Sequence, residues 1–270
     1  MSERLDAAVV AHGYATGRDK AKELIRDGHI TVNGTVITKP SHTVGCGDAV
    51  LCTVDTSPYV GRGGLKLEAA LQALLPLPSP CVAMDVGAST GGFTHCMLTH
   101  GVSTVYAVDV GHGQLHPSLV SDPRVVNLEG CDVRDAAALS AIAPASIDLL
   151  TMDVSFISIG AVLPSLPPYL KRGARMLILI KPQFEAGKHD IGKNGIVKDP
   201  RVHLRVLREV CDTFQTHGCA LQSLSVSPIT GGAGRQSGNI EYVASLIYCA
   251  QPTDVPDLRR LTEEAFAQFR

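Results

Sequence analysis

The sequence predicts an α/β protein in which a small α+β module precedes a doubly wound, seven-stranded sheet. Three observations support this prediction. Apolar, strand-like runs alternate with helical segments from about residue 60 onward, as in a parallel sheet covered by helices. An Asn33-Gly34 turn separates two β-branched runs near the start of the chain. Hydrophobic residues make up 45% of the 270 residues, which is enough to bury a core.

The first domain is expected at residues 1–55, followed by a linker at 56–61. Helical patterns cover 4–10 and 18–27, and strand patterns cover 29–32, 35–37 and 49–54. The second helix is expected to end before Gly28, because glycine readily takes the left-handed conformation found at helix C-termini. These short elements predict an αα-plus-β module.

The second domain is expected at residues 62–270 and carries the sheet. Its seven strands are expected at 81–86, 104–108, 125–128, 147–152, 174–180, 220–226 and 240–247. Helices are expected at 65–75 and 201–217, with a charged helix at 254–270. No repeat or low-complexity tract interrupts this alternation.

Composition narrows the class of protein. The formal net charge of −2 argues against a uniformly basic nucleic-acid coat, although it allows a local basic patch. Apolar runs such as Met176–Ile180 are far shorter than the ~20 residues of a membrane helix, and the charged start shows no signal-peptide core. The eight cysteines include no C-x-x-C pair, so neither a zinc site nor a disulfide framework is expected. We therefore expect a cytoplasmic protein without stable membrane association.

The strongest single motif is the glycine-rich turn Asp85-Val86-Gly87-Ala88-Ser89-Thr90-Gly91-Gly92-Phe93-Thr94, which follows an apolar strand and opens a helix. Glycines at such a turn allow a ligand to approach the backbone closely. The G-x-x-x-G-G form differs from the dinucleotide pattern G-x-G-x-x-G, and the absence of Gly-Lys-Ser/Thr excludes a P-loop. The candidate cofactor contacts here are Asp85, Gly87, Ala88, Ser89, Thr90, Gly91, Gly92 and Phe93.

Acidic residues after the next strands indicate an adenosine-type ligand. Asp109 lies 22 positions after Gly87, a spacing suited to holding ribose hydroxyls. Asp132 follows the third strand and could contact an adenine amino group, and Asp153 follows the fourth. This arrangement resembles that of S-adenosylmethionine-dependent methyltransferases, whose ligand contains an adenosine but no phosphates. The alternative is a tight turn beside solvated aspartates.

The residues after the fourth and fifth strands indicate which kind of atom accepts the methyl group. Asp153 is followed by Val154-Ser155-Phe156 rather than by the Pro-Pro-aromatic sequence of amine methyltransferases, and no cysteine nucleophile is present there. Lys181 follows the fifth strand, where burial disfavours a charged amine. Because a neutral amine can take a proton from a hydroxyl, the pattern favours methylation of oxygen.

Four residues carry a family resemblance. Lys66, Asp153, Lys181 and Glu241 match in order the Lys-Asp-Lys-Glu tetrad of the FtsJ-like ribose 2′-O-methyltransferases, which have a Rossmann-like fold. The module resembles the RNA-binding domain of ribosomal protein S-four through Arg4-Leu5-Asp6, Gly17-Arg18, Ala21, Leu24-Ile25, Gly28, Val32-Asn33-Gly34 and Gly47-Asp48. Nearly the whole chain resembles the TlyA family of ribosomal RNA 2′-O-methyltransferases, also called hemolysin A.

This resemblance implies a substrate and roles for the tetrad. It implies S-adenosylmethionine as cofactor, ribosomal RNA or ribosomal subunits as partner, and cytidines in 16S or 23S RNA as targets, with no metal. Lys181 would accept the hydroxyl proton or steer the hydroxyl lone pair, and Asp153 would orient Lys181. Lys66 would keep Lys181 partly neutral by repulsion, and Glu241 would hold Lys66 and the ribose.

RNA contacts are expected on the module and on two loops, 185–198 and 231–239, which could form a substrate lid. The candidate RNA-binding residues are Arg4, Arg18, Lys20, Lys22, Arg26, Lys188, Lys193 and Arg235. The alternatives are solvated surface charges and a structural Asp153–Lys181 ion pair; the module holds six Lys/Arg against seven Asp/Glu. Two rival functions stay open: a membrane-acting hemolysin and a non-catalytic RNA-binding protein.

Overall fold

The computed structural model describes residues 2–12, 14–15, 17–45, 47–54, 58–192, 195–231, 238–251 and 254–269. The chain divides into two compact units, Met1–Gly61 and Arg62–Arg270. We describe each unit by itself.

The N-terminal unit is an α+β module with two small antiparallel sheets. Its elements are β1 (Ser2–Arg4), α1 (Leu5–Ala11), α2 (Arg18–Arg26), β2 (Ile30–Val32), β3 (Thr35–Val36), β4 (Thr43–Gly45) and β5 (Val50–Cys52). Strands β3, β2 and β5 form one sheet, and β1 pairs with β4 in the other. Asn33 and Gly34 both have positive φ angles, as the Asn-Gly turn requires. The sequence analysis missed β1 and β4, because strands of three residues show no period-2 pattern.

The C-terminal unit contains a seven-stranded sheet in the order β11-β12-β10-β9-β6-β7-β8, which confirms the predicted fold class. Its strands are β6 (Val82–Val86), β7 (Thr104–Asp109), β8 (Val125–Glu129), β9 (Ile147–Met152), β10 (Leu170–Ile180), β11 (Cys219–Val226) and β12 (Tyr242–Tyr248). Six of these strands run in the same direction, and β12 runs opposite to them, antiparallel to β10 and β11.

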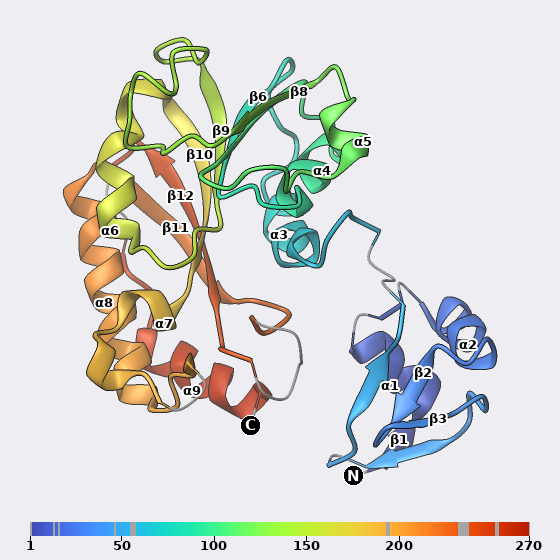
Figure 1. The fold of residues 1–270 in the computed structure, drawn as a ribbon. Helices are drawn as coiled ribbons and strands as arrows, with labels where there is room; N and C mark the ends of the chain where they lie inside the picture. Colours follow the sequence, from blue (N-terminus) through green and yellow to red (C-terminus); the bar gives the residue numbers. More distant parts are fainter. Residues whose placement is uncertain are drawn as a thin grey trace. The chain divides into compact units, whose positions relative to one another are not determined.

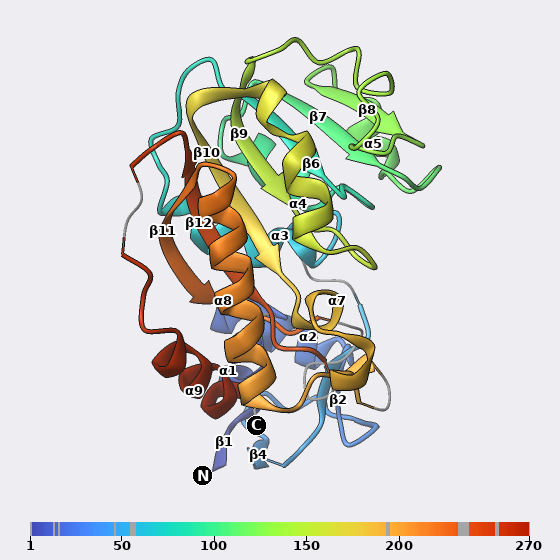
Figure 2. The ribbon, with the colours of Figure 1, turned by 90° about the vertical axis from the view of Figure 1, so that its left-hand side faces the viewer.

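Helices cover both faces of this sheet (Figures 1 and 2). They are α3 (Gly63–Gln72), α4 (Gly92–Thr99), α5 (Pro117–Val120), α6 (Ile159–Val162), α7 (Pro182–Glu185), α8 (Pro200–Thr216) and α9 (Leu258–Phe269), with short 3-10 turns at η1 (Leu163–Ser165), η2 (Pro167–Tyr169) and η3 (Lys188–Asp190). Helices α3 and α4 lie on one face, and α8 lies on the other (Figure 1). Buried Phe214 of α8 and Tyr242 of β12 belong to the main core.

The register of the sheet brings distant residues to one edge. Val86 of β6 pairs with Val108 of β7 and with Met152 of β9, so these three parallel strands end together. In the antiparallel pair, Ile180 at the end of β10 faces Tyr242 at the start of β12. The residues that follow β6, β7, β9 and β10, and the residue that precedes β12, therefore share this edge, where ligands of open α/β sheets bind.

Asp85 lies inside the sheet rather than at its edge. The carboxylate accepts hydrogen bonds from the hydroxyls of Thr94 at 2.7 Å and Thr151 at 2.8 Å. The side chain is fully buried, and burial raises the pKa of Asp85 from its ordinary 3.8 to about 6. We therefore assign Asp85 to tying β6 to α4 and β9.

This burial predicts a pH-dependent stability. Because the folded protein binds the Asp85 proton more tightly than the unfolded chain, the free energy of unfolding should fall as pH rises from 3.8 to about 6. The contribution is on the order of 3 kcal/mol. Asp85→Asn has no such proton, so its stability relative to the wild type should increase over this range. Urea unfolding of both proteins at the two ends of the range measures the difference, and a difference that does not change with pH would contradict the prediction.

Candidate active site

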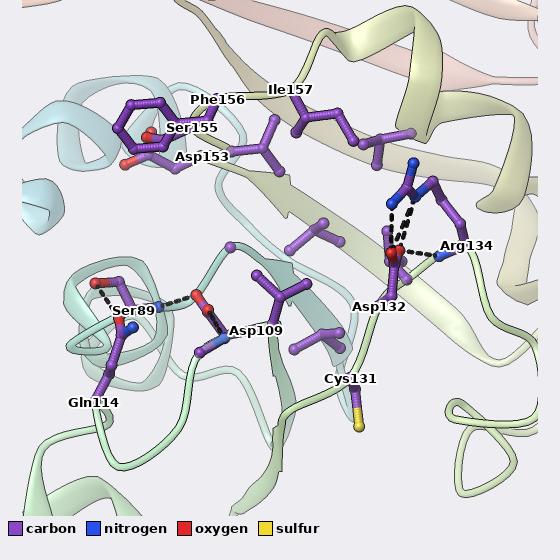
Figure 3. A pocket seen from close by; sticks show the side chains of 18 residues that line it. Ser89, Asp109, Gln114, Cys131, Asp132, Arg134, Asp153, Ser155, Phe156 and Ile157 are labelled. Carbon is purple, nitrogen blue, oxygen red and sulfur yellow. Dashed lines mark hydrogen bonds and ion pairs between the residues drawn. The ribbon is translucent and has the colours of Figure 1, made fainter.

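A cavity of about 550 Å³ opens at the edge where β6, β7 and β9 end (Figure 3). Five of the predicted cofactor residues line it: Gly87, Ser89, Asp109, Asp132 and Asp153. Valine and isoleucine side chains form its apolar wall: Val108, Val110, Val133, Ile157 and Val162. Its volume lies within the ~300–1,000 Å³ usual for small-molecule sites.

Gly87 allows two segments to meet at the floor of the cavity. Its φ of +81° is in the left-handed region, and a Cβ there would lie 2.8 Å from the carbonyl oxygen of Asp153. The Asp153 N–H donates to the Val86 carbonyl at 2.9 Å. Glycine is therefore required for the backbone after β9 to pack against the turn after β6.

Asp109 is oriented by backbone donors. Its carboxylate accepts the Ser89 N–H at 2.8 Å and the Gly111 N–H at 2.7 Å, one on each oxygen. A carboxylate has about four lone-pair sites, so both oxygens can still accept hydroxyl donors. This geometry fits a ligand that presents two neighbouring hydroxyls.

Asp132 stands across the cavity from Asp109 and is paired with Arg134 (Figure 3). The guanidinium donates from Nε at 2.9 Å and from Nη2 at 2.5 Å, which lowers the pKa of Asp132 to about 2. Sequence reasoning missed Arg134, although its spacing of two residues from Asp132 is a signal for a local ion pair.

The structure does not bring the other predicted cofactor residues to this cavity. Those residues are Asp85, Ala88, Thr90, Gly91, Gly92 and Phe93. Thr90 is exposed to solvent, whereas the other five are buried, and Gly92 and Phe93 already belong to α4. Phe93, for example, is buried and packs beside Gly63.

The four tetrad residues form two short ion pairs. Lys66 Nζ lies 2.6 Å from Glu241 Oε2, and Lys181 Nζ lies 2.6 Å from Asp153 Oδ1. Their side chains are 11%, 2%, 10% and 19% exposed, in that order. Each shielded amine therefore has its own carboxylate. Lys66 contacts Glu241, as the resemblance implies. The expected repulsion between Lys66 and Lys181 is weakened, because Glu241 and Asp153 each neutralise one of the two amines.

Two neutral side chains extend these pairs. Lys181 Nζ also donates to the Ser155 hydroxyl at 2.9 Å, and its partner oxygen, Asp153 Oδ1, takes no well-directed hydrogen bond. Gln183 Nε2 donates to Glu241 Oε1 at 3.3 Å. Sequence reasoning assigned no role to Ser155 or Gln183.

Phe156 is an aromatic residue that sequence reasoning also left without a role. Its side chain is 92% exposed, its φ is +64°, and its ring lies 5.0 Å from the ring of Phe184. The residue lines the mouth of the cavity, beside Ser155 and Asp153 (Figure 3). A signal was available, because Phe156 stands where amine methyltransferases carry an aromatic residue.

In the N-terminal module, the predicted RNA-binding residues fall into two groups. Arg4 and Arg18 converge on buried Asp6, at 3.0 and 3.1 Å, and the hydrogen bond from Arg4 is the main cause that lowers the pKa of Asp6 to about 2. Lys20 and Lys22 pair with acidic residues of their own helix, and Arg26 is exposed.

The two loops meet in their described parts. The Asn239 side chain accepts the Val197 N–H at 3.0 Å and donates to the Gly195 carbonyl at 2.9 Å. Lys188 is exposed in η3, while Lys193 and Arg235 lie outside the described residues. Within the described ranges, no cluster of three metal-ligating side chains occurs, and none of the helices is long and apolar enough to span a membrane.

Comparison with known proteins agrees with this geometry. The chain matches the FtsJ-like methyltransferase family over residues 59–248 and the S4 domain over residues 3–50. It is 40% identical over 240 residues to the 16S/23S rRNA (cytidine-2'-O)-methyltransferase TlyA of Mycobacterium tuberculosis, which covers 88% of this chain and 87% of that protein. It is 40% identical over 271 residues to YqxC of Bacillus subtilis, with coverage of 97% and 94%. A solved structure from Streptococcus thermophilus has a TM-score of 0.73 and 36% identity, covering 99% of this chain and 97% of that one.

Proposed function

This chain belongs to the FtsJ-like methyltransferase family, and from that premise we propose that it methylates ribose 2′-hydroxyls of ribosomal RNA, using S-adenosylmethionine. The observation that carries the proposal is the pair of lysine–carboxylate contacts, Lys181–Asp153 and Lys66–Glu241, at the end of the sheet where a nucleoside-sized cavity opens. Asp153 belongs to one of these pairs and also lines the cavity. The relative from Mycobacterium tuberculosis, whose name specifies 16S/23S rRNA and cytidine, favours the same substrate.

The cavity fits S-adenosylmethionine better than a nucleotide. Asp109 would accept hydrogen bonds from the ribose hydroxyls, and Asp132 would accept one from the adenine amino group. Both carboxylates would repel phosphates, and the guanidinium of Arg134 is already paired with Asp132. When bound, the cofactor supplies a methyl group activated by a positively charged sulfur.

Lys181 would steer the acceptor hydroxyl. An ammonium has three N–H donors, and the hydrogen bond to Ser155 leaves donors for the 2′-oxygen. This hydrogen bond would direct an oxygen lone pair at the methyl group, and alignment of this kind contributes strongly to rate. The hydroxyl proton would pass to the carboxylate of Asp153, because an ammonium has no lone pair to accept it. Lys66, fixed by Glu241, would hold the ribose from the other side.

We prefer an enzyme to a non-catalytic RNA-binding protein because both lysines are shielded. Burying an amine is costly even when it is paired, and an ion pair that served stability alone could be replaced by apolar side chains at little cost. Two such pairs at the end of the sheet where the cavity opens are the arrangement expected of an active site. No feature of the described residues supports a membrane-acting hemolysin to the same extent.

Lys181→Ala tests the proposal directly. We expect a ~10²–10⁴-fold loss in methyl transfer, because the steering group is removed and Asp153, the proton acceptor, loses the amine that holds it. Affinity for S-adenosylmethionine should stay near that of the wild type, since Lys181 does not line the cavity. The measurements are mapping of methylated riboses in ribosomal RNA and calorimetric titration of the cofactor. Lys171→Ala is the matched control and should keep full activity, because Lys171 lies at the opposite end of β10, half-exposed and paired with Asp148. Equal rates in the two variants would refute the role of Lys181.

Phe156 is expected to stack on the base of the target nucleotide. Because stacking on an aromatic ring contributes ~1–3 kcal/mol per base, Phe156→Ala should lower kcat/KM for RNA by roughly 5- to 150-fold. The melting temperature should not fall, because the ring is exposed. Phe156→Tyr keeps a stacking surface and should retain most of the activity. Steady-state kinetics with all three proteins decide the matter, and an Ala variant with unchanged kcat/KM would rule stacking out.

Arg18 is expected to contact an RNA phosphate. Its guanidinium is held by Asp6 but half-exposed, so donors remain for an anion. Arg18→Gln should reduce the slope of log K against log salt by about 0.7–0.9, the share of one phosphate contact. Lys20→Gln should change the slope less, because Lys20 is paired with Glu23. Fluorescence titration of ribosomal RNA at several salt concentrations gives these slopes, and equal changes in both variants would contradict the assignment.

A further inference from the structure

We propose that Gln183 is a positioning residue for the methyl transfer: its side-chain amide holds Glu241, and through it the amine of Lys66. This inference rests on the proposed function and adds a residue to it. Gln183 lies in α7, two residues after Lys181, and donates from Nε2 to Glu241 Oε1 at 3.3 Å. The other oxygen of Glu241 pairs with Lys66. Amide, carboxylate and amine thus form a row from one edge of the site to the other.

Glu241 needs both of these partners because it is only 2% exposed. A buried carboxylate without donors on each oxygen is costly, and removing one partner of a buried hydrogen bond costs ~1–3 kcal/mol. Within the described part of the chain, Lys66 and Gln183 each donate to one oxygen of the carboxylate. Gly231 leaves the space that the carboxylate occupies, since a Cβ at that position would collide with Oε1.

The orientation of the Gln183 amide also supports a positioning role. Its own oxygen, Oε1, is buried and has no hydrogen-bond partner in the described structure. Turning the amide over would place this oxygen against the carboxylate oxygen of Glu241, which is repulsive. The amide therefore satisfies Glu241 at the expense of its own acceptor. Such an unpaired group is unfavourable for folding and calls for another reason, which the site supplies.

The amide also connects the two ion pairs. Lys181 and Gln183 are separated only by Pro182, whose ring restricts the backbone between them. Lys181 holds Asp153 on one side, and Gln183 holds Glu241 on the other. The short segment 181–183 thus sets the spacing between the amine that steers the hydroxyl and the pair that holds the ribose.

Two substitutions separate positioning from mere support. Gln183→Met keeps the length of the side chain and removes the donor; we expect kcat to fall about 10-fold, the equivalent of one hydrogen bond of ~1.4 kcal/mol, with unchanged affinity for S-adenosylmethionine. Gln183→Glu places a second carboxylate against Glu241. Because two facing carboxylates share a proton, this variant should be weakly active at high pH. It should recover towards the wild type as pH falls, when the protonated carboxyl becomes a donor.

The experiment measures methyl transfer to ribosomal RNA by the full-length proteins from roughly pH 5.5 to 8.5, with cofactor affinity and melting temperature alongside. Gln215→Glu, on the exposed side of α8, is the matched control and should follow the wild-type pH profile. Lys66 is the charged group in direct contact with Glu241, so its pairing is common to all variants.

The inference is overturned if Gln183→Met is as active as the wild type, or if Gln183→Glu lacks the additional pH dependence. It is also overturned if both variants lose cofactor binding and thermal stability together, because that outcome indicates structural support alone. Failure of the proposed function looks different: the wild-type protein itself would then transfer no methyl group to ribose.

Discussion

The site depends on the need to neutralise two amines that are shielded from water. An isolated ammonium in such surroundings is strongly disfavoured, so Lys66 and Lys181 each require a carboxylate within contact distance. Glu241 and Asp153 meet this requirement at 2.6 Å. Because partners in each pair come from different parts of the chain, the pairs form only when the whole sheet is assembled. The chemistry of the site is therefore coupled to the fold.

The sheet makes this coupling possible through the direction of its strands. Parallel β6, β7, β9 and β10 end at one edge, and antiparallel β12 begins there. Gly87 then lets the segment after β9 approach the turn after β6, which places Asp153 beside the cavity. Within this frame the side chains divide their tasks. Asp85, inside the sheet, ties strands together, whereas Asp109 and Asp132 line the cavity.

The N-terminal module also contains a buried charge that requires partners of opposite charge, but here the buried group is a carboxylate. Buried Asp6 draws in Arg4 and Arg18, and both guanidiniums stay about half exposed. A carboxylate that fixes two arginines reduces the entropy they would lose on contacting a phosphate. The lysines of α2, by contrast, pair with acidic residues on their own helix. Positive charges that look equivalent in the sequence therefore differ in how firmly the structure holds them.

The sequence by itself determined the fold class and the order of the seven strands along the chain, and its resemblance to the FtsJ-like family predicted the tetrad. Hydrophobic periodicity, the Asn-Gly turn and the residues that follow each strand are local signals, and they can be interpreted from the sequence alone. Tertiary structure alone decided which carboxylate neutralises which lysine, and that Asp85 and Phe93 are buried while Phe156 is exposed. It also revealed the contact of Gln183 with Glu241. These properties depend on side chains that lie far apart in sequence, so burial and pairing arise only when strand register brings them together.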